Sequence, residues 1–259
     1  MKEILLKNIW FKTYYYKIAE SGSSSLEHPA MKKLLDLASR ASDILDMGCG
    51  DGTRLSKLVK KGQKGYGIDI SSKAISIARK KYPNLNFLVG DLENLPYKND
   101  SFDLVYSAFV FEHLDDPARV IEEAIRVLRP GGLFLIVSPN FGAPNRASPP
   151  YRGNRFIKLM AGLVNDFMFS KSLSWNKVEP LNTGQKYQID DDTTIEPYLG
   201  SLLKFLKHKG LTIRYYSSCW EEELPNRSFY QRIFGFLGRT GIYPFKYWGS
   251  HLLVISEKE

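Results

Sequence analysis

The sequence predicts a protein of the α/β class, with a mostly parallel sheet and helices on both faces. Apolar segments of strand length alternate with amphipathic segments of helix length over roughly residues 43–140, as in βαβ units. The first strand leads directly into the glycine-rich stretch Asp46–Thr53, which is typical of a tight strand-turn-helix junction. The segment at 133–138 is apolar up to its last residue, Ser138, as a central parallel strand should be.

The alternating core is expected to begin with a strand at 43–47 and to end with the strand at 133–138. The best-marked helix lies between them at 117–128, because Asp116 can cap it and Pro117 suits its first position. The other elements expected in this core are a helix near 53–61, a strand at 65–70, a helix at 72–81, a strand at 85–89 and a strand at 102–107.

The second half of the chain is expected to contain two insertions. The first, about 139–192, is rich in proline and glycine and is predicted to be irregular. It ends in the acidic run 190–192, which suits the N-terminal dipole of the helix expected at 195–209 better than it suits a metal site. The second insertion, 219–249, is dense in aromatic residues and lies between the two strands that would complete the sheet, at 211–217 and 251–256.

The N-terminal part is predicted to form a separate helical cap over residues 1–41, ahead of a main domain at 42–259. Residues 1–20 suggest an aromatic-rich helix, and 21–25 form a Gly-Ser stretch that looks flexible. A second helix is expected to begin near Pro29. The aromatic insertions and this cap could together form a lid over the sheet edge.

Composition favours a soluble protein of a reducing, cytoplasmic compartment. The 259 residues include only two cysteines, too few for a disulfide framework, and no signal peptide or membrane-spanning run is visible. The net charge of +8 lies outside residues 43–140, which are neutral. Simple solubility, an anionic substrate and peripheral contact with an anionic membrane all remain open as reasons for the basic flanks.

Three acidic residues mark the expected ligand-binding edge of the sheet. Asp46, Asp69 and Asp91 each lie at the C-terminal end of a predicted strand, where open α/β sheets bind their ligands. The glycine spacing differs from the dinucleotide fingerprint, and no phosphate-binding lysine follows it. Carboxylates repel phosphates, so the sequence predicts a nucleoside without a pyrophosphate, with positive charge allowed.

At this point the chain resembles the class I S-adenosylmethionine-dependent methyltransferases, in particular the small-molecule branch that includes ubiquinone-biosynthesis-type enzymes. The resemblance covers about residues 40–140 closely. It implies a Rossmann-like sheet of seven strands with the last strand antiparallel. The blocks that carry it are Asp46–Gly52, Gly67–Asp69, Gly90–Leu92, Ser101–Val105, Glu112–Leu114 and Leu128–Gly132.

The resemblance also implies roles for individual residues in binding S-adenosylmethionine, whose product is S-adenosylhomocysteine. Asp46 would lie near the amino group of the methionine part, Asp69 would bind the two ribose hydroxyls, and Asp91 would hold the adenine with the Leu92 backbone. An Asp at the end of a strand is also a good turn former. The remaining residues that the resemblance places around the cofactor are Gly48, Cys49, Gly50, Gly52, Ile70 and Ser107.

His113 is the candidate general base, with Glu112 as a possible orienting residue. Both follow the fourth strand, in the loop that faces the methyl position in the resembling enzymes. A base is needed only for a weakly acidic acceptor such as a hydroxyl. Adjacent helical side chains diverge, so a direct Glu112–His113 pair is doubtful, and His113 could instead shape its loop. No metal is expected.

The acceptor is expected to be small or amphipathic: a lipid, quinone, polyketide or lipid-linked sugar, with O-methylation favoured. The first alternative is a methyltransferase for RNA or another nucleic acid that uses the basic flanks. The stretch Ser148–Tyr151 resembles a motif of enzymes that methylate planar amino groups, but it lies after the fifth strand rather than the fourth. The second alternative is a cofactor-binding protein without catalysis. The oligomeric state is not predicted.

Overall fold

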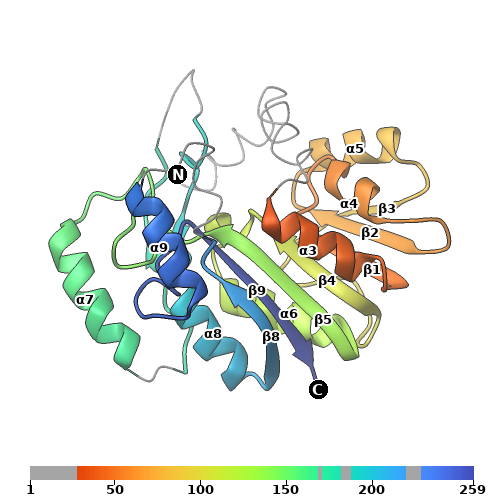
Figure 1. Cartoon of the computed structure of the whole chain (residues 1–259). Coiled ribbons are helices and arrows are strands. Elements are labelled where there is room, and N and C mark those ends of the chain that lie inside the picture. Colours follow the sequence, from red (N-terminus) through yellow and green to blue (C-terminus); the bar gives the residue numbers. More distant parts are fainter. Residues whose placement is uncertain (1–27, 169–170, 182–187, 220–228) are drawn as a thin grey trace. The chain divides into compact units, whose positions relative to one another are not determined.

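The computed structural model describes residues 28–168, 171–181, 188–219 and 229–259 (Figure 1). The helix predicted at 1–20 and the Gly-Ser stretch lie outside the described residues. The chain divides into two compact units, each described by itself. In the described residues, the first unit comprises the chain up to Val110 with Asp116–Leu135 and Glu257–Glu259, and the second comprises Phe111–Asp115 and Ile136–Ser256.

Seven strands form one hydrogen-bonded sheet in the order β3-β2-β1-β4-β5-β9-β8. Figure 1 shows β9 running opposite to β5, so the predicted α/β, Rossmann-like class with an antiparallel last strand is confirmed. In chain order the strands are β1 (Asp43–Met47), β2 (Lys64–Asp69), β3 (Asn86–Val89), β4 (Phe102–Ala108), β5 (Leu128–Pro139), β8 (Leu211–Ser217) and β9 (His251–Lys258).

The strands of the first unit align their C-terminal ends. β1 pairs in parallel with both β2 and β4, and Asp46 lies opposite Gly67 on one side and Tyr106 on the other. β2 pairs in parallel with β3, with Asp69 opposite Val89. The chain therefore moves outward from β1 to β3 and then returns to the other side of β1. This reversal creates a topological switch point between β1 and β4, where open α/β sheets bind ligands.

Helix boundaries in the first unit follow local capping. The side chain of Ser71 accepts a hydrogen bond from Ala74 N, and that of Asp116 accepts one from Arg119 N, so each satisfies an otherwise free backbone donor. The predicted helix near 53–61 is shorter, because Val59 is extended. The helices are α3 (Pro29–Ala38), α4 (Thr53–Leu58), α5 (Ser72–Lys81) and α6 (Pro117–Val127).

The second unit contains more regular structure than the sequence predicted. The segment expected to be irregular contains a helix, α7, because Asn154 caps it by accepting hydrogen bonds from two backbone N–H groups. Among the described residues, no helix is both long and apolar enough to cross a membrane. Besides strands of the seven-stranded sheet, the second unit contains the 3-10 helix η1 (Phe111–His113), α7 (Arg155–Phe167), β6 (Asn176–Lys177), β7 (Ile195–Glu196), α8 (Leu199–His208) and α9 (Phe229–Arg239).

The placement of the acidic run was predicted wrongly. α8 begins at Leu199 rather than at 195, so the acids at 190–192 are too far away to act on its N-terminal dipole. The intervening Ile195 and Glu196 form β7, which pairs antiparallel with β6. Asp191 and Asp192 are buried, which a solvated first helical turn would not require.

Candidate active site

The turn between β1 and α4 is folded back onto the end of β2. The N–H groups of Gly48 and Cys49 both donate to the carbonyl oxygen of Ile68, at 2.8 and 3.1 Å. The N–H of Gly50 donates to Oδ2 of Asp69 at 2.9 Å. These bonds couple the glycine turn to the acidic residue predicted to bind ribose.

The three glycines of this turn have different surroundings although all have positive φ angles. A Cβ atom on Gly48 would lie 2.4 Å from Val110, and one on Gly52 would lie 2.6 Å from Phe87. A Cβ atom on Gly50 would have no described atom within 4 Å. Gly48 and Gly52 therefore allow close packing, whereas Gly50 borders open space into which a ligand could approach the backbone.

Asp46 is a buried carboxylate with one unsatisfied oxygen. Tyr106 donates its hydroxyl to Oδ2 at 2.6 Å, but Oδ1 has no hydrogen-bond partner among the described residues. Burial raises the pKa of Asp46 to about 6, although the positive charge of Arg54 opposes the shift. Since buried polar atoms are nearly always paired, this oxygen suits a ligand that brings its own donor.

Asp69 uses its carboxylate to join two backbone segments. Oδ2 accepts from Gly50, and Oδ1 accepts from the N–H of Ser71 at 2.8 Å. Burial raises the pKa of this carboxyl despite both hydrogen bonds. Each carboxylate oxygen can accept more than one hydrogen bond, so both retain capacity for a ligand hydroxyl. The adjacent side chain of Ile70 is exposed.

Asp91 is exposed and acts as a turn former. Its Oδ1 accepts from the N–H of Glu93 at 2.9 Å, the local pattern that favours Asp in turns. The neighbouring Leu92 is buried. This geometry supports the alternative that Asp91 is a turn-forming residue. The predicted contact of Asp91 with adenine stays a prediction.

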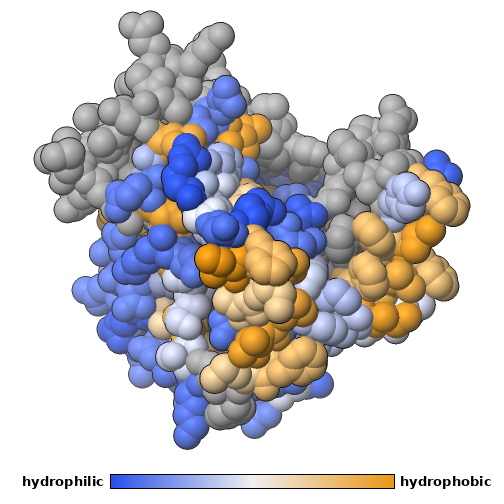
Figure 2. Space-filling view, turned by 90° about the vertical axis from the view of Figure 1, so that its left-hand side faces the viewer, coloured by the Kyte–Doolittle hydropathy of each residue, from blue (hydrophilic) through white to orange (hydrophobic). Residues whose placement is uncertain are grey.

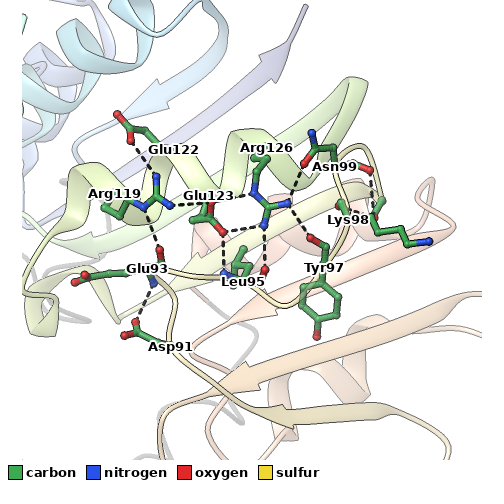
Figure 3. A network of polar contacts seen from close by, with 11 residues as sticks. Asp91, Glu93, Leu95, Tyr97, Lys98, Asn99, Arg119, Glu122, Glu123 and Arg126 are labelled. Atoms are coloured by element: carbon green, nitrogen blue, oxygen red, sulfur yellow. Dashed lines mark hydrogen bonds and ion pairs between the residues drawn. The ribbon is translucent and has the colours of Figure 1, made fainter.

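The segment that follows Asp91 is held against α6 by a charged pair (Figure 3). Arg126 bonds Glu123 through two contacts of 2.9 and 2.8 Å. Arg126 also donates to the carbonyl oxygens of Leu95 and Tyr97, at 3.0 and 2.8 Å. Glu123 accepts the N–H of Leu95 at 2.8 Å. The Arg126–Glu123 ion pair thus binds both backbone N–H and backbone carbonyl groups of this loop.

The polar atoms of Cys49 and Ser107 are already engaged within the fold. Ser107 donates its hydroxyl to the carbonyl of Met47 at 3.0 Å, joining β4 to β1. The Sγ of Cys49 lies 3.7 Å from the carbonyl oxygen of Gly50. Burial raises the pKa of the Cys49 thiol well above its ordinary value, so this cysteine is no thiolate nucleophile.

In the second unit, His113 lies among carboxylates. Its Nδ1 is 3.2 Å from the carbonyl oxygen of Asp192, and because a carbonyl can only accept, Nδ1 carries the proton of this bond. Nδ1 is also 3.7 Å from a carboxylate oxygen of Asp192, and Nε2 is 3.8 Å from Oε1 of Glu112. The doubtful Glu112–His113 pair is therefore an electrostatic contact longer than a hydrogen bond.

These charges shift one another's protonation. Burial favours the neutral imidazole, but the carboxylates of Asp192 and Glu112 outweigh it and raise the pKa of His113. Burial raises the pKa of Glu112, although the side chain of Ser138 donates to it at 2.8 Å. Burial likewise raises the pKa of Asp190 to about 6. The cluster can therefore hold or release protons close to neutral pH.

Sequence reasoning missed the acidic side of this cluster. Asp192 follows His113 by 79 positions, so no local spacing links the two. The N–H of Thr194 donates to the carbonyl of Glu112 at 2.9 Å, which holds the 190–194 segment against η1. Only the unusual density of three adjacent acids was visible in the sequence, and it fitted a helix start equally well.

The Ser148–Tyr151 stretch is explained by packing. Ser148 donates both its N–H and its hydroxyl to Oε1 of Glu196, at 2.8 and 3.0 Å. Glu196 also pairs with Lys158 at 2.6 Å, and the Lys158 ammonium lies 4.5 Å from the ring centre of Tyr151. Ser148 and Tyr151 of this stretch thus belong to a structural network around the buried Glu196–Lys158 ion pair.

Two tests bear on the implied ligands. Within the described ranges, no group of three or more His, Cys, Asp or Glu side chains could hold a metal ion. For S-adenosylmethionine, the first unit offers an unpartnered buried oxygen on Asp46 and an open approach at Gly50. These residues fit a ligand with a cationic amino group. A joint site that also includes His113 stays a prediction, because His113 belongs to the second unit.

Comparisons with known proteins agree with this geometry. Residues 45–136 match the family described as methyltransferase domain. The chain is 32% identical over 134 residues to a probable S-adenosylmethionine-dependent methyltransferase of Mycolicibacterium smegmatis, covering 51% of this chain and 52% of that protein. It is 40% identical over 101 residues to a demethylmenaquinone methyltransferase of Chlorobaculum tepidum, covering 39% and 42%. The chain thus spans about half the length, or less, of these relatives.

A solved structure extends the likeness in fold beyond the matched region. An S-adenosylmethionine-dependent methyltransferase from Mesorhizobium loti superposes with a TM-score of 0.59 at 20% identity, covering 90% of this chain and 100% of the other. At 20% sequence identity, this similarity shows a shared fold only. The family match, the relatives and the fold agree: residues 45–136 form a methyltransferase domain, and the chain resembles the class I methyltransferases, whose cofactor is S-adenosylmethionine.

Proposed function

We propose that this chain is an enzyme that transfers a methyl group from S-adenosylmethionine to a small or amphipathic acceptor of lipid or quinone type. The observation that carries the proposal is the turn between β1 and α4. It combines the unpartnered Oδ1 of Asp46 with open space at Gly50. A buried carboxylate oxygen without a donor suits an ammonium group, and open space beside a glycine lets a ligand approach the backbone.

Each part of the cofactor has a candidate partner. Asp46 would hold the amino group, Asp69 would accept the ribose hydroxyls, and Asp91 with the Leu92 backbone would hold the adenine. The chemistry that S-adenosylmethionine supplies is a methyl group activated by a positively charged sulfur. The residues that would line the rest of the site are Gly48, Cys49, Gly50, Gly52, Ile70 and Ser107.

His113 is proposed as the general base for a hydroxyl acceptor. Its Nδ1–H is engaged by the Asp192 carbonyl, so in the neutral tautomer Nε2 is the atom able to take a proton. Glu112 and Asp192 would act by positioning the ring and setting its pKa. Beyond proton removal, the protein must align the acceptor with the methyl group and exclude water. This alignment can supply much of the rate acceleration.

The acceptor class rests on the relatives and on charge. One relative bears the name demethylmenaquinone methyltransferase, which points toward a quinone-like acceptor. Residues 141–259 are rich in aromatic side chains and carry net positive charge. A lipid- or quinone-like acceptor partitions into membranes, so peripheral contact with an anionic membrane belongs to the proposal.

Cofactor binding is tested by calorimetry on the wild-type chain with S-adenosylmethionine and S-adenosylhomocysteine. Loss of hydrogen bonds from a charged acceptor should weaken binding by roughly 10- to 100-fold in Asp69→Ala. Asp36→Ala is the control, because Asp36 is an exposed residue paired with Arg40 on α3. Wild-type affinity in a folded Asp69→Ala protein would remove Asp69 from the site.

Activity is tested by mass spectrometry of products from a panel that includes demethylated quinones, lipid extracts and RNA. Methylation of a quinone or lipid supports the proposal. Turnover on RNA alone would replace it with a nucleic-acid activity. Tight cofactor binding with no turnover on any member of the panel would instead favour a binding protein without catalysis.

A further inference from the structure

The helix α7 is inverted: it turns charged residues toward the protein and apolar residues outward. Its inward face includes Lys158, which is buried, and Asp166, which is half-buried. Gly162 lies on the same face, where a Cβ atom would come within 2.4 Å of Pro144. A surface helix of a water-soluble protein normally has the opposite arrangement.

Lys158 fastens the N-terminal half of α7. Its ammonium donates to Oε2 of Glu196 at 2.6 Å and to the carbonyl oxygen of Phe141 at 2.8 Å. Both side chains of the ion pair are almost fully buried. Because breaking such a pair leaves an uncompensated buried charge, this half of α7 is held with its orientation defined.

Asp166 fastens the C-terminal half. Tyr198 donates to its Oδ1 at 2.5 Å, and Tyr243 and Trp248 both donate to its Oδ2 at 3.1 Å. Three aromatic donors on one carboxylate fix which face of the helix points inward. The outward direction of the apolar face is therefore determined by hydrogen bonds.

The outward face of α7 is a continuous apolar stripe. Figure 2 looks onto the side on which α7 lies in Figure 1 and shows hydrophobic residues gathered there with hydrophilic ones around them. Side-chain exposure reaches 70% at Phe156 and 78% at Phe167. Exposed apolar patches of this kind mark interaction sites. The stripe consists of Phe156, Ile157, Met160, Val164, Phe167 and Met168.

α9, in the same unit, has a second stripe of the same kind. Gly235 and Gly238 are buried, and half-buried Phe234 stacks on Phe245 with ring centres 5.2 Å apart, so these residues face the protein. The exposed apolar residues recur at helical spacing, and Phe229 is 73% exposed. They are Phe229, Tyr230, Ile233 and Phe236.

In the described residues, the exposed charged side chains on α9 and at the start of α7 have one sign. Near α7 the exposed charged residues are Arg152 and Arg155, and on α9 they are Arg232 and Arg239. The only acidic residue between 141 and 168 is Asp166, which faces inward, and residues 229–249 contain no acidic residue. An apolar face with basic residues beside it is the pattern of helices that lie in the surface of an anionic bilayer.

We propose that the outward faces of α7 and α9 form a docking surface for a membrane containing anionic lipids. The aromatic and aliphatic side chains enter the boundary between headgroups and acyl chains, and the arginines contact lipid phosphates. This specifies which surface makes the membrane contact included in the proposed function. Vesicle binding needs no methyl acceptor, so its failure would leave the methyl-transfer proposal standing.

The test is cosedimentation of the full chain with vesicles of phosphatidylcholine, alone or mixed equally with phosphatidylglycerol. We expect binding to the mixed vesicles that weakens as salt increases. Removing two apolar anchors in Phe156→Gln/Phe167→Gln should lower the affinity at least about 10-fold. Leu88→Gln is the control, because it changes an exposed apolar residue of β3 in the first unit. Circular dichroism checks that each variant is folded.

Several results would overturn the proposal. One is absence of wild-type binding to the mixed vesicles, and another is equal binding by the double variant and by wild type. Concentration-dependent dimerisation that is lost in the double variant, without vesicle binding, would assign the surface to a second copy of this chain. Solvent protection of α7 in the vesicle-free monomer that disappears when residues 1–27 are removed would assign it to that segment.

Discussion

The ring of His113 donates its Nδ1–H to the backbone carbonyl oxygen of Asp192 across 3.2 Å, so the imidazole is fixed by a residue that also contributes a buried negative charge. The hydrogen bond sets the tautomer, while the carboxylates of Asp192 and Glu112 raise the pKa. A base with a raised pKa is protonated over more of the neutral range. The hydrogen bond therefore leaves Nε2 available to accept a proton, whereas the nearby carboxylates reduce the fraction of His113 that is neutral at neutral pH.

The first prediction concerns the pH dependence of turnover. As the proposed general base, His113 would act in its neutral form, and its pKa is raised, so the rate should rise with pH in a range above about 6.5, the ordinary value for histidine. Asp192→Asn removes one cause of the raised pKa and should move the profile to lower pH. Asp191→Asn is the matched control, because Asp191 is also buried but does not contribute to the shift.

His113→Gln completes this test. General-base catalysis contributes about 10²- to 10⁴-fold, so turnover should fall by that factor while cofactor affinity stays the same. Near wild-type turnover with an unchanged pH profile would make His113 a structural residue. Its raised pKa would then appear in stability, as a contribution present below about pH 6.5 and lost as the pH rises through the raised value.

The second prediction concerns Asp46. Its pKa is about 6, and only the ionised carboxylate attracts an ammonium group strongly. The affinity for S-adenosylmethionine should therefore fall as the pH decreases through about 6, approaching about 10-fold per pH unit. Calorimetry at several pH values measures this. Asp46→Asn should remove the dependence, and adenosine, which lacks the amino acid part, should not show it. An equal pH dependence in Asp46→Asn would contradict the assignment.

The third prediction separates the glycines of the turn. Alanine with positive φ costs about 1–2 kcal/mol, so both Gly50→Ala and Gly52→Ala should be less stable than wild type. Gly52→Ala additionally brings a Cβ to 2.6 Å from Phe87, which should add about 1–3 kcal/mol. Gly50→Ala has no such clash and should instead weaken cofactor binding. Denaturant unfolding and calorimetry compare them, and equal effects on both quantities would refute the distinction.

The fourth prediction concerns the ion pair in Figure 3. Arg126→Ala leaves buried Glu123 with only the longer ion pair to Arg119, at 3.5 Å, and should destabilise the fold by about 1.5–3 kcal/mol. The hydrogen bonds from Arg126 are the main cause of the lowered pKa of Glu123. The contribution is therefore present above the ordinary carboxyl range and is lost as the pH falls through the lowered value.

Chemical denaturation at neutral and acidic pH measures this difference. Arg40→Ala is the control, because its pair with Asp36 is exposed and should contribute little. If the two arginine variants were equally stable at neutral pH, the network would not hold the loop after Asp91.

Local sequence patterns were sufficient for the first half of the fold. Ser71 and Asp116 cap their helices as short-range hydrogen bonding requires, and the strand at 43–47 has the bounds that the sequence predicted. The motif around Asp46 and the acids at strand ends carried the resemblance to class I methyltransferases, because parallel strands bring these residues to one edge. All of these signals extend over only a few neighbouring residues.

Residue chemistry alone could not reveal relationships that join distant parts of the chain. Gly48, Gly50 and Gly52 look equivalent in the sequence, yet Val110, Phe87 and open space distinguish them. The run at 190–192 fitted a helix dipole until the fold placed Asp192 beside His113.

The orientation of α7 shows the same division. Its amphipathic pattern can be read from residues 155–167 alone, and by the usual rule the apolar face would point inward. Here the polar face points inward, because Glu196 binds Lys158, and Tyr198 and Trp248, which are distant in the sequence, bind Asp166. A pattern along the chain specifies how a helix divides its faces, but which face is buried depends on the partners that folding brings to it.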